Sequence, residues 1–573
     1  MKIDNILGRR EFEAIALAVA LATGGCATPP ANQKATAPSP TPGTKSTAKQ
    51  PAVQACAPLP AVSGTVCRVQ PGTSQYFLIA GQVLTPDTTY DGGGVLVGPD
   101  GKIAAVGCDA LARAAQLGAT QVICPSASIS PGLINTHDHI SYNWNAPGRW
   151  GTERYDRRNQ WRKGIEGHTR IRADPGTDEQ TAWSELRHVL AGTTSIAGSG
   201  GHSGLVRNLD KPNLLEGLQT DYANYSTFPL GDVTDVTPHM SDCNYPKIDD
   251  PGLVLSHQCY LPHMAEGVDL AANNEIRCMD QAKLITSKGA YVHSVAALGT
   301  DGQMLYQRGA SVVWSPRSNI ALYGNTAQVT MYANLGIKMA LATDWSPSGS
   351  INLLRELQCA DSYNTRNLDG FFSDYDLWMM VTANAADAVH VNGQIGRLAP
   401  GLVADIAVFS GPSGATPYRR VLNANVDSVS LVVRGGIPLY GDTNIFLQVP
   451  NWASDCEPLP GGVLGSNKTL CTKRELGESF AQLQSNNIKS YPLFFAGIPD
   501  NEPTCIPSRL AVPGKEAGYT GLSTAGDYDG DGVPDKLDNC PMIFNPIRPV
   551  DNGKQADCNN NGIGDACDPT PCK

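Results

Sequence analysis

The sequence predicts an α/β protein built around a (β/α)8 barrel of the TIM type, and two observations support that prediction. Between residues 129 and 393, short apolar runs of strand length alternate with stretches of helical character. Four of these runs end on a residue that can bind a metal or carry a proton, as barrel strands do at their C-terminal ends. We therefore expect the chemistry to lie at one face of a barrel.

The first strand end is the run Ser-Pro-Gly-Leu-Ile-Asn-Thr-His-Asp-His, which closes on His137 and His139. Side chains alternate along a strand, so residues two apart point to the same side. The spacing thus places two imidazoles together, as a metal site requires. A strand that happens to carry two histidines has the same pattern, so this motif depends on the others.

Three further runs complete the series. His263 and Glu266 stand three apart in Tyr-Leu-Pro-His-Met-Ala-Glu, His293 closes Ala-Tyr-Val-His, and Asp344 follows an apolar run that begins at Ile337. In this order the motifs resemble the amidohydrolase superfamily, in the branch of cytosine deaminase and related mononuclear metal hydrolases. The resemblance spans about residues 75 to 447 and includes the segments 192–194, 315–319 and 401–406.

The resemblance implies the role of each residue. His137, His139, His263 and Asp344 would hold one Zn²⁺, or Fe²⁺, which lowers the pKa of a bound water toward neutrality. Asp344 would also accept a proton from that water, and Glu266 would pass it to the substrate. His293 would donate a hydrogen bond to the attacking hydroxide or the developing oxyanion. The hydroxide would attack an sp² carbon that bears nitrogen in a small-molecule substrate.

A single catalytic metal is favoured, because no lysine stands at the end of a fourth strand and Glu266 belongs to the one-metal branch. Near the site, the sequence places four candidate pocket residues, Trp314, Asn319, Trp345 and Ser346. His202, after the second strand, could reach the mouth of the site. The other histidines are expected on surfaces or loops, namely His168, His188, His239, His257 and His390.

The segments that flank the barrel, 75–128 and 394–447, alternate apolar and polar residues between glycine turns, which predicts antiparallel strands. In the resembled family such segments join into one composite β-sandwich. Residues 448–520 are interpreted as a Cys-containing extension with one helical stretch near 475–484. The barrel itself is assigned to 129–393.

The C-terminal segment, 521–573, predicts a calcium site. Acidic residues at alternating positions around a glycine offer the hard oxygen ligands that Ca²⁺ prefers, and a second, Asn-containing run repeats the pattern. Both runs resemble thrombospondin type 3 repeats, and we expect the segment to be an independent unit. The candidate ligands are Asp527, Asp529, Asp531, Asp535 and Asp538, then Asp557, Asn559, Asn561, Asp565 and Asp568.

The N-terminus predicts export. Residues 1–26 read as a signal peptide whose end, Thr-Gly-Gly-Cys, resembles a bacterial lipoprotein cleavage site with Cys26 lipidated. A faint twin-arginine pattern at Arg9 and Arg10 leaves the export route open. Residues 27–74, rich in Pro, Ala and Thr, are expected to be a disordered tether. The expected location is the cell envelope or cell surface, with a membrane anchor, or alternatively the periplasm or the medium.

Composition adds two constraints. A net charge of −11 argues against a nucleic-acid surface. Sixteen cysteines in an exported chain favour disulfides, and lipidation of Cys26 would leave an odd number. Plausible local pairs are Cys56–Cys67, Cys108–Cys124, Cys243–Cys259 and Cys456–Cys471.

The sequence therefore favours a metal-dependent hydrolase of carbon–nitrogen bonds other than peptide bonds, a deaminase or an amidase-like enzyme. Two alternatives remain at this stage. The same site could hydrolyse another bond, in a lactone or an aryl halide, since fold does not fix function. The chain could also be a calcium-binding surface or adhesion protein with a non-catalytic barrel.

Overall fold

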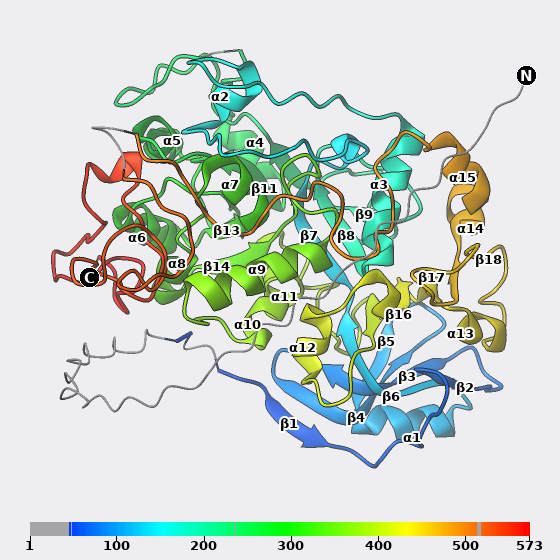
Figure 1. The fold of residues 1–573 in the computed structure, drawn as a ribbon. Helices are drawn as coiled ribbons and strands as arrows, with labels where there is room; N and C mark the ends of the chain where they lie inside the picture. The colour runs from blue at the N-terminus through cyan, green and yellow to red at the C-terminus, as the bar shows by residue number, and fades with distance from the viewer. Residues whose placement is uncertain (1–44, 47–48, 235, 513–516, 573) are drawn as a thin grey trace, which may run out of the picture. The chain divides into compact units, whose positions relative to one another are not determined.

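In the computed structural model, which describes residues 45–46, 49–234, 236–512 and 517–572, eight short parallel strands form the predicted barrel (Figure 1). One sheet holds three of them and a second sheet holds five. Backbone hydrogen bonding between Leu209 and Ala223 links the sheets on one side. The strands are β7 (Leu133–Asp138), β8 (Thr193–Gly198), β9 (Arg207–Asn208), β10 (Ala223–Ser226), β11 (Cys259–Met264), β12 (Ala290–His293), β13 (Ser311–Trp314) and β14 (Lys338–Leu341).

The barrel closes at the predicted metal ligands. A parallel bridge joins Asp138 to Asp344, and the backbone of Asp344 exchanges hydrogen bonds with His137 and His139. The first and last strands are thus joined where their functional side chains stand. The interior is filled by small and branched side chains, for example Ala197, Val292 and Ala340, all fully buried.

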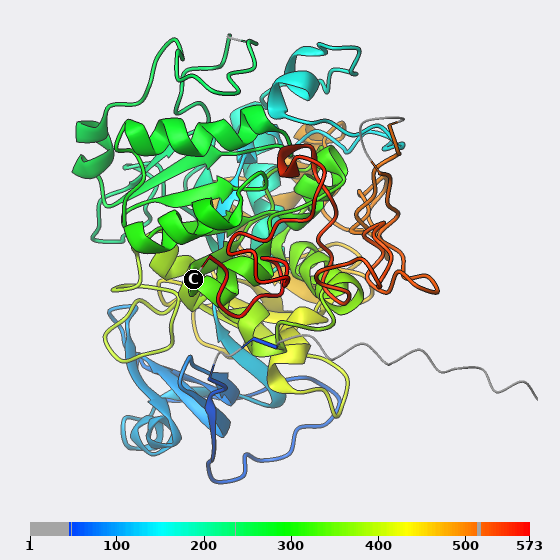
Figure 2. The same ribbon diagram turned by 90° about the vertical axis from the view of Figure 1, so that its left-hand side faces the viewer.

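Helices cover the barrel where the connections are long enough to form them (Figure 2). No helix occurs in the described connections from β8 to β9 and from β9 to β10, which run over 199–206 and 209–222, so the barrel departs here from the regular strand–helix alternation. The barrel helices are α2 (Arg158–Lys163), α3 (Asp178–Leu190), α4 (Pro251–Ser256), α5 (Leu270–Gln281), α6 (Gly299–Arg308), α7 (Pro316–Tyr323), α8 (Val329–Leu335), α9 (Leu353–Asn367), α10 (Asp374–Met379) and α11 (Ala383–Ala388).

The two flanking segments do join into one sheet, as the resemblance implied. Strand β6 pairs antiparallel with β15, so that Ser130 stands opposite Ala407. Not all pairing is antiparallel, because β3 runs parallel to β6. The sheet contains β1 (Ala52–Ala55), β2 (Arg68–Gln70), β3 (Phe77–Leu84), β4 (Thr88–Val97), β5 (Ile103–Gly107), β6 (Thr120–Pro131), β15 (Ile406–Phe409), β16 (Val429–Arg434), β17 (Ile437–Asp442), β18 (Glu457–Pro458) and β19 (Lys468–Leu470).

The predicted boundaries of this sheet are too narrow on both sides. Strands β1 and β2 come from the segment predicted as a disordered tether, and β18 and β19 come from the predicted extension. Strand β1 pairs with β4 and strand β2 pairs with β6, and the disulfides of Cys56 and Cys67 hold this segment to the sheet. Composition alone could not predict these long-range contacts. The signal peptide, Cys26 and residues 27–44 lie outside the described residues. Helices α1 (Cys108–Gln116), α12 (Pro417–Leu422) and α13 (Thr443–Gln448) accompany the sheet.

The extension 448–520 packs against α3 and against the helix-free connection that follows β8. Its helical stretch is split at Gly477 into α14 (Thr472–Leu476) and α15 (Phe480–Asn486). Phe480 stacks on Trp183 of α3, whose indole donates to the carbonyl of Tyr491. A Cβ at Gly204 would lie 2.4 Å from the carbonyl oxygen of Glu475, so glycine permits this close contact.

The C-terminal segment lies beside α6 and α8 and is not structurally independent (red in Figures 1 and 2). Arg548, fully buried, donates to the carbonyls of Val295 and Ala297, and the amide of Val550 donates to Val268. Phe544 belongs to the main hydrophobic cluster of the barrel. The sequence predicted an independent unit, and the packing contradicts this prediction. Apolar side chains of the segment, such as Phe544, pack against the barrel and do not form a core of their own.

Seven disulfides connect the described cysteines, and three of the four predicted local pairs are wrong. The observed pairs are Cys56–Cys108, Cys67–Cys124, Cys243–Cys278, Cys359–Cys505, Cys456–Cys471, Cys540–Cys567 and Cys558–Cys572. Strand register explains one correction: Arg68 pairs with Ile123 between β2 and β6, which places Cys67 opposite Cys124. Cys259 is the one free thiol among the described residues and is buried in the barrel strand β11.

None of the described helices combines the length and the apolar character needed to cross a bilayer.

Candidate metal centre and active site

Four buried side chains meet at the C-terminal ends of the barrel strands. One ligand atom each of His137, His263, His293 and Asp344 lies within 4.8 Å of all the others. The fifth predicted residue, His139, joins them: its Nε2 is 3.3 Å from Nε2 of His263 and 3.6 Å from Oδ1 of Asp344. The structure therefore brings together all four sequence-predicted ligands, with His293 beside them.

Two of these residues, His293 and Asp344, have a left-handed backbone conformation, which directs their side chains toward the cluster. Val292 faces the barrel interior, so strict alternation would turn the next side chain away. His293 adopts φ 72° and Asp344 φ 64°, a region that non-glycine residues rarely occupy. Such backbone persists where the surrounding structure holds it, and it is concentrated at functional sites.

The electrostatics of the cluster suit a cation. Burial lowers the pKa of His137 and His139 to about 4 and that of His293 to about 3. The imidazoles are therefore neutral bases, as metal ligands must be. Nδ1 of His137 and of His263 and Nε2 of His293 are buried without a hydrogen-bond partner, which is costly unless a ligand satisfies them. Three or four imidazoles with one carboxylate fit a divalent transition metal.

Glu266 stands next to this cluster. Its Oε2 is 3.8 Å from Nε2 of His293, and its Oε1 accepts a hydrogen bond of 2.8 Å from the hydroxyl of Tyr323. Burial, together with the nearby Asp344 carboxylate, raises the pKa of Glu266 to about 8. A carboxyl group with a pKa near neutrality is suited to accept and release a proton.

Several residues that sequence reasoning missed hold the cluster in place. The hydroxyl of Tyr225 lies 3.2 Å from Nδ1 of His139, and Ser318 donates to Oδ2 of Asp344. Tyr225 belongs to no motif that the sequence displays, whereas Ser318 stands in the motif segment 315–319, which did not indicate its contact with Asp344. Of the four candidate pocket residues, Asn319 lies 3.0 Å from Nδ1 of His293, and Trp345 lines the cavity described next.

The remaining predictions near the site are wrong or only partly right. The Trp314 indole donates to Thr326 inside the core, and the Ser346 hydroxyl donates to backbone carbonyls. His202 is absent from the cavity lining. His188 and His239 are buried rather than superficial, and Nε2 of His188 lies 3.3 Å from Oδ2 of Asp138.

A cavity of about 350 Å³ opens onto the cluster, a size typical of small-molecule sites. His139, His263, Glu266 and Asp344 are among the residues that line it. Residues of α2 and of the loop that follows it also contribute to the lining. The basic residues of 154–163 were the sequence signal that could have placed this segment at the site.

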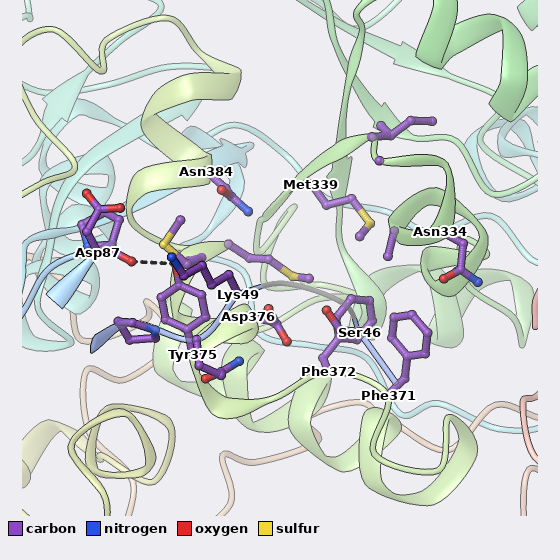
Figure 3. Close-up of a pocket in the computed structure, with 18 residues that line it drawn as sticks. Ser46, Lys49, Asp87, Asn334, Met339, Phe371, Phe372, Tyr375, Asp376 and Asn384 are labelled. Carbon is purple, nitrogen blue, oxygen red and sulfur yellow. Dashed lines mark hydrogen bonds between the residues drawn. The ribbon is translucent and has the colours of Figure 1, made fainter. Parts of the chain in front are cut away.

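A larger cavity, of about 540 Å³, lies at the other end of the barrel strands (Figure 3). Gly336 and Ile337, which precede β14, line it together with Tyr375 and with Lys49 from the tether. Its lining contains no histidine. The cavity beside the metal cluster is therefore the candidate active site.

The acidic loops of the tail differ from each other. Carboxylate oxygens of Asp527, Asp529 and Asp531 lie within 4.8 Å of one another, and Oδ2 of Asp529 is buried without a hydrogen-bond partner. Burial and the neighbouring carboxylates raise the pKa of Asp529 and of Asp531. Asp538 accepts from Gln555 beside this group, and Asp535 accepts from the amide of Tyr528.

In the second loop the polar groups satisfy one another. The side-chain amides of Asn559 and Asn561 each donate to Oδ2 of Asp568 at 3.0 Å. Asp557 accepts from the backbone amide of Gly562, and Asp565 accepts from that of Cys558. The structure thus gathers three of the first five predicted ligands closely. In both loops the first aspartate accepts backbone hydrogen bonds, and the second loop differs because its two asparagine amides also donate to Asp568.

Two segments of the chain match known families. Residues 257–437 match the amidohydrolase family, and residues 525–548 match the thrombospondin type 3 repeat. Both matches fall on the segments where the sequence motifs resemble these families.

Two curated relatives carry the same name. A 5-methylthioadenosine/S-adenosylhomocysteine deaminase of Nitratidesulfovibrio vulgaris is 28% identical over 226 residues, which cover 36% of this chain and 51% of that protein. The enzyme of the same name from Syntrophobacter fumaroxidans is 34% identical over 119 residues, 20% of this chain and 27% of that protein. The chain thus spans about half the length, or less, of these relatives.

Solved structures share the fold. A triazine hydrolase variant covers 72% of this chain and 99% of its own, with a TM-score of 0.53 at 18% identity. Atrazine chlorohydrolase from Arthrobacter aurescens TC1, complexed with zinc, matches the same shares with a TM-score of 0.51 at 17% identity. This likeness confirms the predicted barrel with its flanking sheet.

Proposed function

We propose that the barrel is a metal-dependent hydrolase of carbon–nitrogen bonds other than peptide bonds, acting as a deaminase or amidase on a small molecule. The observation that carries the proposal is the convergence of three imidazoles and Asp344, with Glu266 beside them, in one cavity. The deaminase name of the curated relatives supports the same reaction class.

The cluster would hold one Zn²⁺, or Fe²⁺, through His137, His139, His263 and Asp344. When bound, such a metal supplies an activated water nucleophile at neutral pH. The zinc in the atrazine chlorohydrolase structure supports this choice of metal. The lone-pair atoms already face one another, so the protein needs little rearrangement to accept the ion.

The side chains would divide the proton transfers. Asp344, which is oriented by Ser318, is placed to accept the proton of the attacking water. Glu266, held by the Tyr323 hydroxyl, is placed to carry a proton from Oε2 to the leaving nitrogen of the substrate. His293, fixed by Asn319 at Nδ1, offers Nε2 to the oxygen that gains charge when water adds to the sp² carbon.

The test is elemental analysis of the purified protein combined with an ammonia-release screen over aminated heterocycles and amides. We expect one transition metal per chain and release of ammonia by at least one substrate class. A metal-replete protein that releases no ammonia or amine would overturn the proposal and favour a non-catalytic barrel or cleavage of another bond.

For the tail, we propose Ca²⁺ as the ion of the first acidic loop. The clustered oxygens of Asp527, Asp529 and Asp531 and the unpartnered Oδ2 of Asp529 support it. Isothermal titration with Ca²⁺ and with Mg²⁺ tests the proposal. Equal affinity for the two ions would contradict a dedicated calcium site.

We also propose that the protein is exported and anchored to the membrane through a lipid at Cys26. Seven disulfides support an oxidising compartment. Incorporation of labelled palmitate that is lost in Cys26→Ser would agree with the anchor. Equal incorporation in the variant would exclude it.

A further inference from the structure

Four cations line the active-site cavity. They are Arg158, Arg162, Lys163 and Arg170, from α2 and the loop after it. The only carboxylates in that lining are Glu266 and Asp344, which belong to the catalytic cluster. The cavity lining therefore has more cationic than anionic side chains.

One of these cations is neutralised inside the protein. The Arg158 guanidinium forms ion pairs of 2.8 Å with Asp232 and 3.3 Å with Glu275, and its side chain is 2% exposed. By contrast, no carboxylate within the described residues forms an ion pair with Arg162, Lys163 or Arg170. These three charges are available to a ligand.

Arg162 has the environment of a binding residue. Its guanidinium lies 4.1 Å from the centre of the Phe228 ring, and Nη2 donates to the carbonyl of Val233 at 3.2 Å. Nη1 is buried and has no hydrogen-bond partner. An orphaned donor on a fixed guanidinium is destabilising by itself, and an oxyanion would satisfy it.

The helix dipole of α2 is an alternative explanation for some of these cations, but not for all three. Arg162 and Lys163 stand in the last turn of α2, where positive charge is favoured by the helix dipole. Arg170 lies beyond the helix and still lines the same cavity. A helix-end effect therefore does not explain why three unpaired cations converge on one cavity.

Aromatic rings form the other walls. Trp161 and Trp345 have centroids 5.5 Å apart, and Tyr142 and Phe228 complete the lining. Such walls accommodate a flat ring. The cavity lining thus combines aromatic rings and cationic side chains with residues of the catalytic cluster.

We propose that the substrate is a planar nitrogen-bearing ring that carries an oxyanion substituent, a carboxylate or a phosphate, bound by Arg162 with Lys163 and Arg170. This inference rests on the proposed hydrolase function of the same site. It adds that the anionic group is a determinant of specificity, since a neutral ring would leave Nη1 of Arg162 unsatisfied.

The catalytic test uses matched pairs on the metal-loaded protein: adenosine against adenosine 5′-monophosphate, and 5′-methylthioadenosine against S-adenosylhomocysteine. A binding test runs in parallel by titration calorimetry with inorganic phosphate and with benzoate, and it requires no turnover. The two arms of each test distinguish a phosphate from a carboxylate.

We expect Arg162→Gln to weaken binding of the anions, or to raise KM for the anionic substrate, roughly 10- to 100-fold, the loss of one charge-assisted hydrogen bond. Binding of the neutral partner should stay within about threefold. Arg162→Lys should recover part of the loss, because it retains the charge, and Lys163→Gln should show a smaller loss. Arg172→Gln is the matched control, since Arg172 is exposed and outside the lining.

The inference is overturned if wild type and Arg162→Gln bind phosphate and benzoate equally. It is also overturned if phosphate binding is lost in His263→Ala but kept in Arg162→Gln, because the anion would then sit on the metal. If no ring or amide is hydrolysed, the proposed function fails, and the calorimetric comparison still decides the anion site.

Discussion

The metal cluster of the barrel and the first acidic loop of the tail are both buried, yet burial acts on them in opposite directions. It lowers the pKa of His137 and its neighbours, so the barrel site consists of neutral bases. It raises the pKa of Asp529 and Asp531, so the tail site consists of acids that resist ionisation. The barrel site can bind a metal without first releasing protons from its histidines. The tail site, whose carboxyl groups tend to keep their protons, is stabilised most when a cation takes the place of those protons.

The largest effect is expected from removing a ligand of the barrel cluster. His263→Ala should lose the transition metal and all measurable turnover, because the substitution removes one of the four proposed ligands and leaves a gap in the set of donors around the ion. Metal content by mass spectrometry is the measurement. Asn334→Ala, on α8 outside the cluster, serves as the control. Undiminished metal in His263→Ala would refute the ligand assignment, and two metals in wild type would refute the one-metal site.

Glu266→Gln separates metal binding from proton transfer. The variant should retain its metal and lose about 10²- to 10⁴-fold in kcat, the usual contribution of a general acid or base. Tyr323→Phe removes the hydrogen bond to Glu266, together with the one that the Tyr323 hydroxyl accepts from the Trp161 indole, and should cost much less. If Glu266→Gln stays within a few-fold of wild type, Glu266 takes no part in the reaction.

Breaking the contact between tail and barrel should destabilise both. Arg548→Ala leaves the buried carboxylate of Asp551 unpaired, which costs about 3–5 kcal/mol. All eight tryptophans lie before residue 453, so tryptophan fluorescence reports the barrel and sheet alone. We expect the unfolding midpoint from this signal to fall. An unchanged midpoint would restore the sequence-based interpretation of an independent tail.

The two acidic loops should differ in calcium affinity. Asp529→Asn removes the buried carboxylate with the unpartnered oxygen and should weaken Ca²⁺ binding roughly 10- to 100-fold, on the scale of one charge-assisted contact. Asp557→Asn removes a carboxylate from the second loop, at the position that corresponds to Asp527, and should have the smaller effect. Calorimetry on both variants decides, and equal losses would show that the loops are equivalent.

A buried acid without a cation offers a pH test. Burial raises the pKa of Glu185, on α3, from 4.5 to about 8. Between these values the folded state holds a proton that the unfolded state has lost, so this group lowers stability as pH rises, by at most about 1.4 kcal/mol per pH unit.

Glu185→Gln should remove that slope between about pH 4.5 and 8, and Glu179→Gln, exposed on the same helix, should not. Denaturant unfolding across this range is the measurement. Identical pH profiles for Glu185→Gln and wild type would show that Glu185 does not titrate in this window.

The barrel and its cluster were predictable because strand periodicity and ligand spacing are local properties. His137 and His139 lie on one strand, and each further ligand ends its own apolar run. The partners that orient them were not predictable. Tyr225 and Tyr323 act through contacts across the fold, and nothing in their local sequence marks them. Ser318 stands in the motif segment 315–319, but its hydrogen bond to Asp344 depends on the fold.

Packing of the outer segments escaped the sequence for the same reason. Strand β1 has no buried residue, so its sequence shows no hydrophobic pattern that would predict a strand. Its position is determined by its pairing with β4. Likewise, the few apolar residues of the tail, such as Phe544, gave no indication of which surface they cover. Long-range pairing, rather than local propensity, decides both.

The disulfide pattern has a consequence for how the chain matures. The disulfides Cys56–Cys108 and Cys67–Cys124 cross each other in sequence order. Neither Cys56 nor Cys67 is therefore bonded to the next cysteine along the chain. A chain oxidised in the order in which its thiols emerge would first make the neighbouring pair Cys56–Cys67, the same error that reasoning from sequence makes. Reaching the native set then requires thiolate attack on a formed bond and its exchange. Production in a host that oxidises thiols but lacks an isomerase should therefore yield scrambled protein even when every cysteine is oxidised.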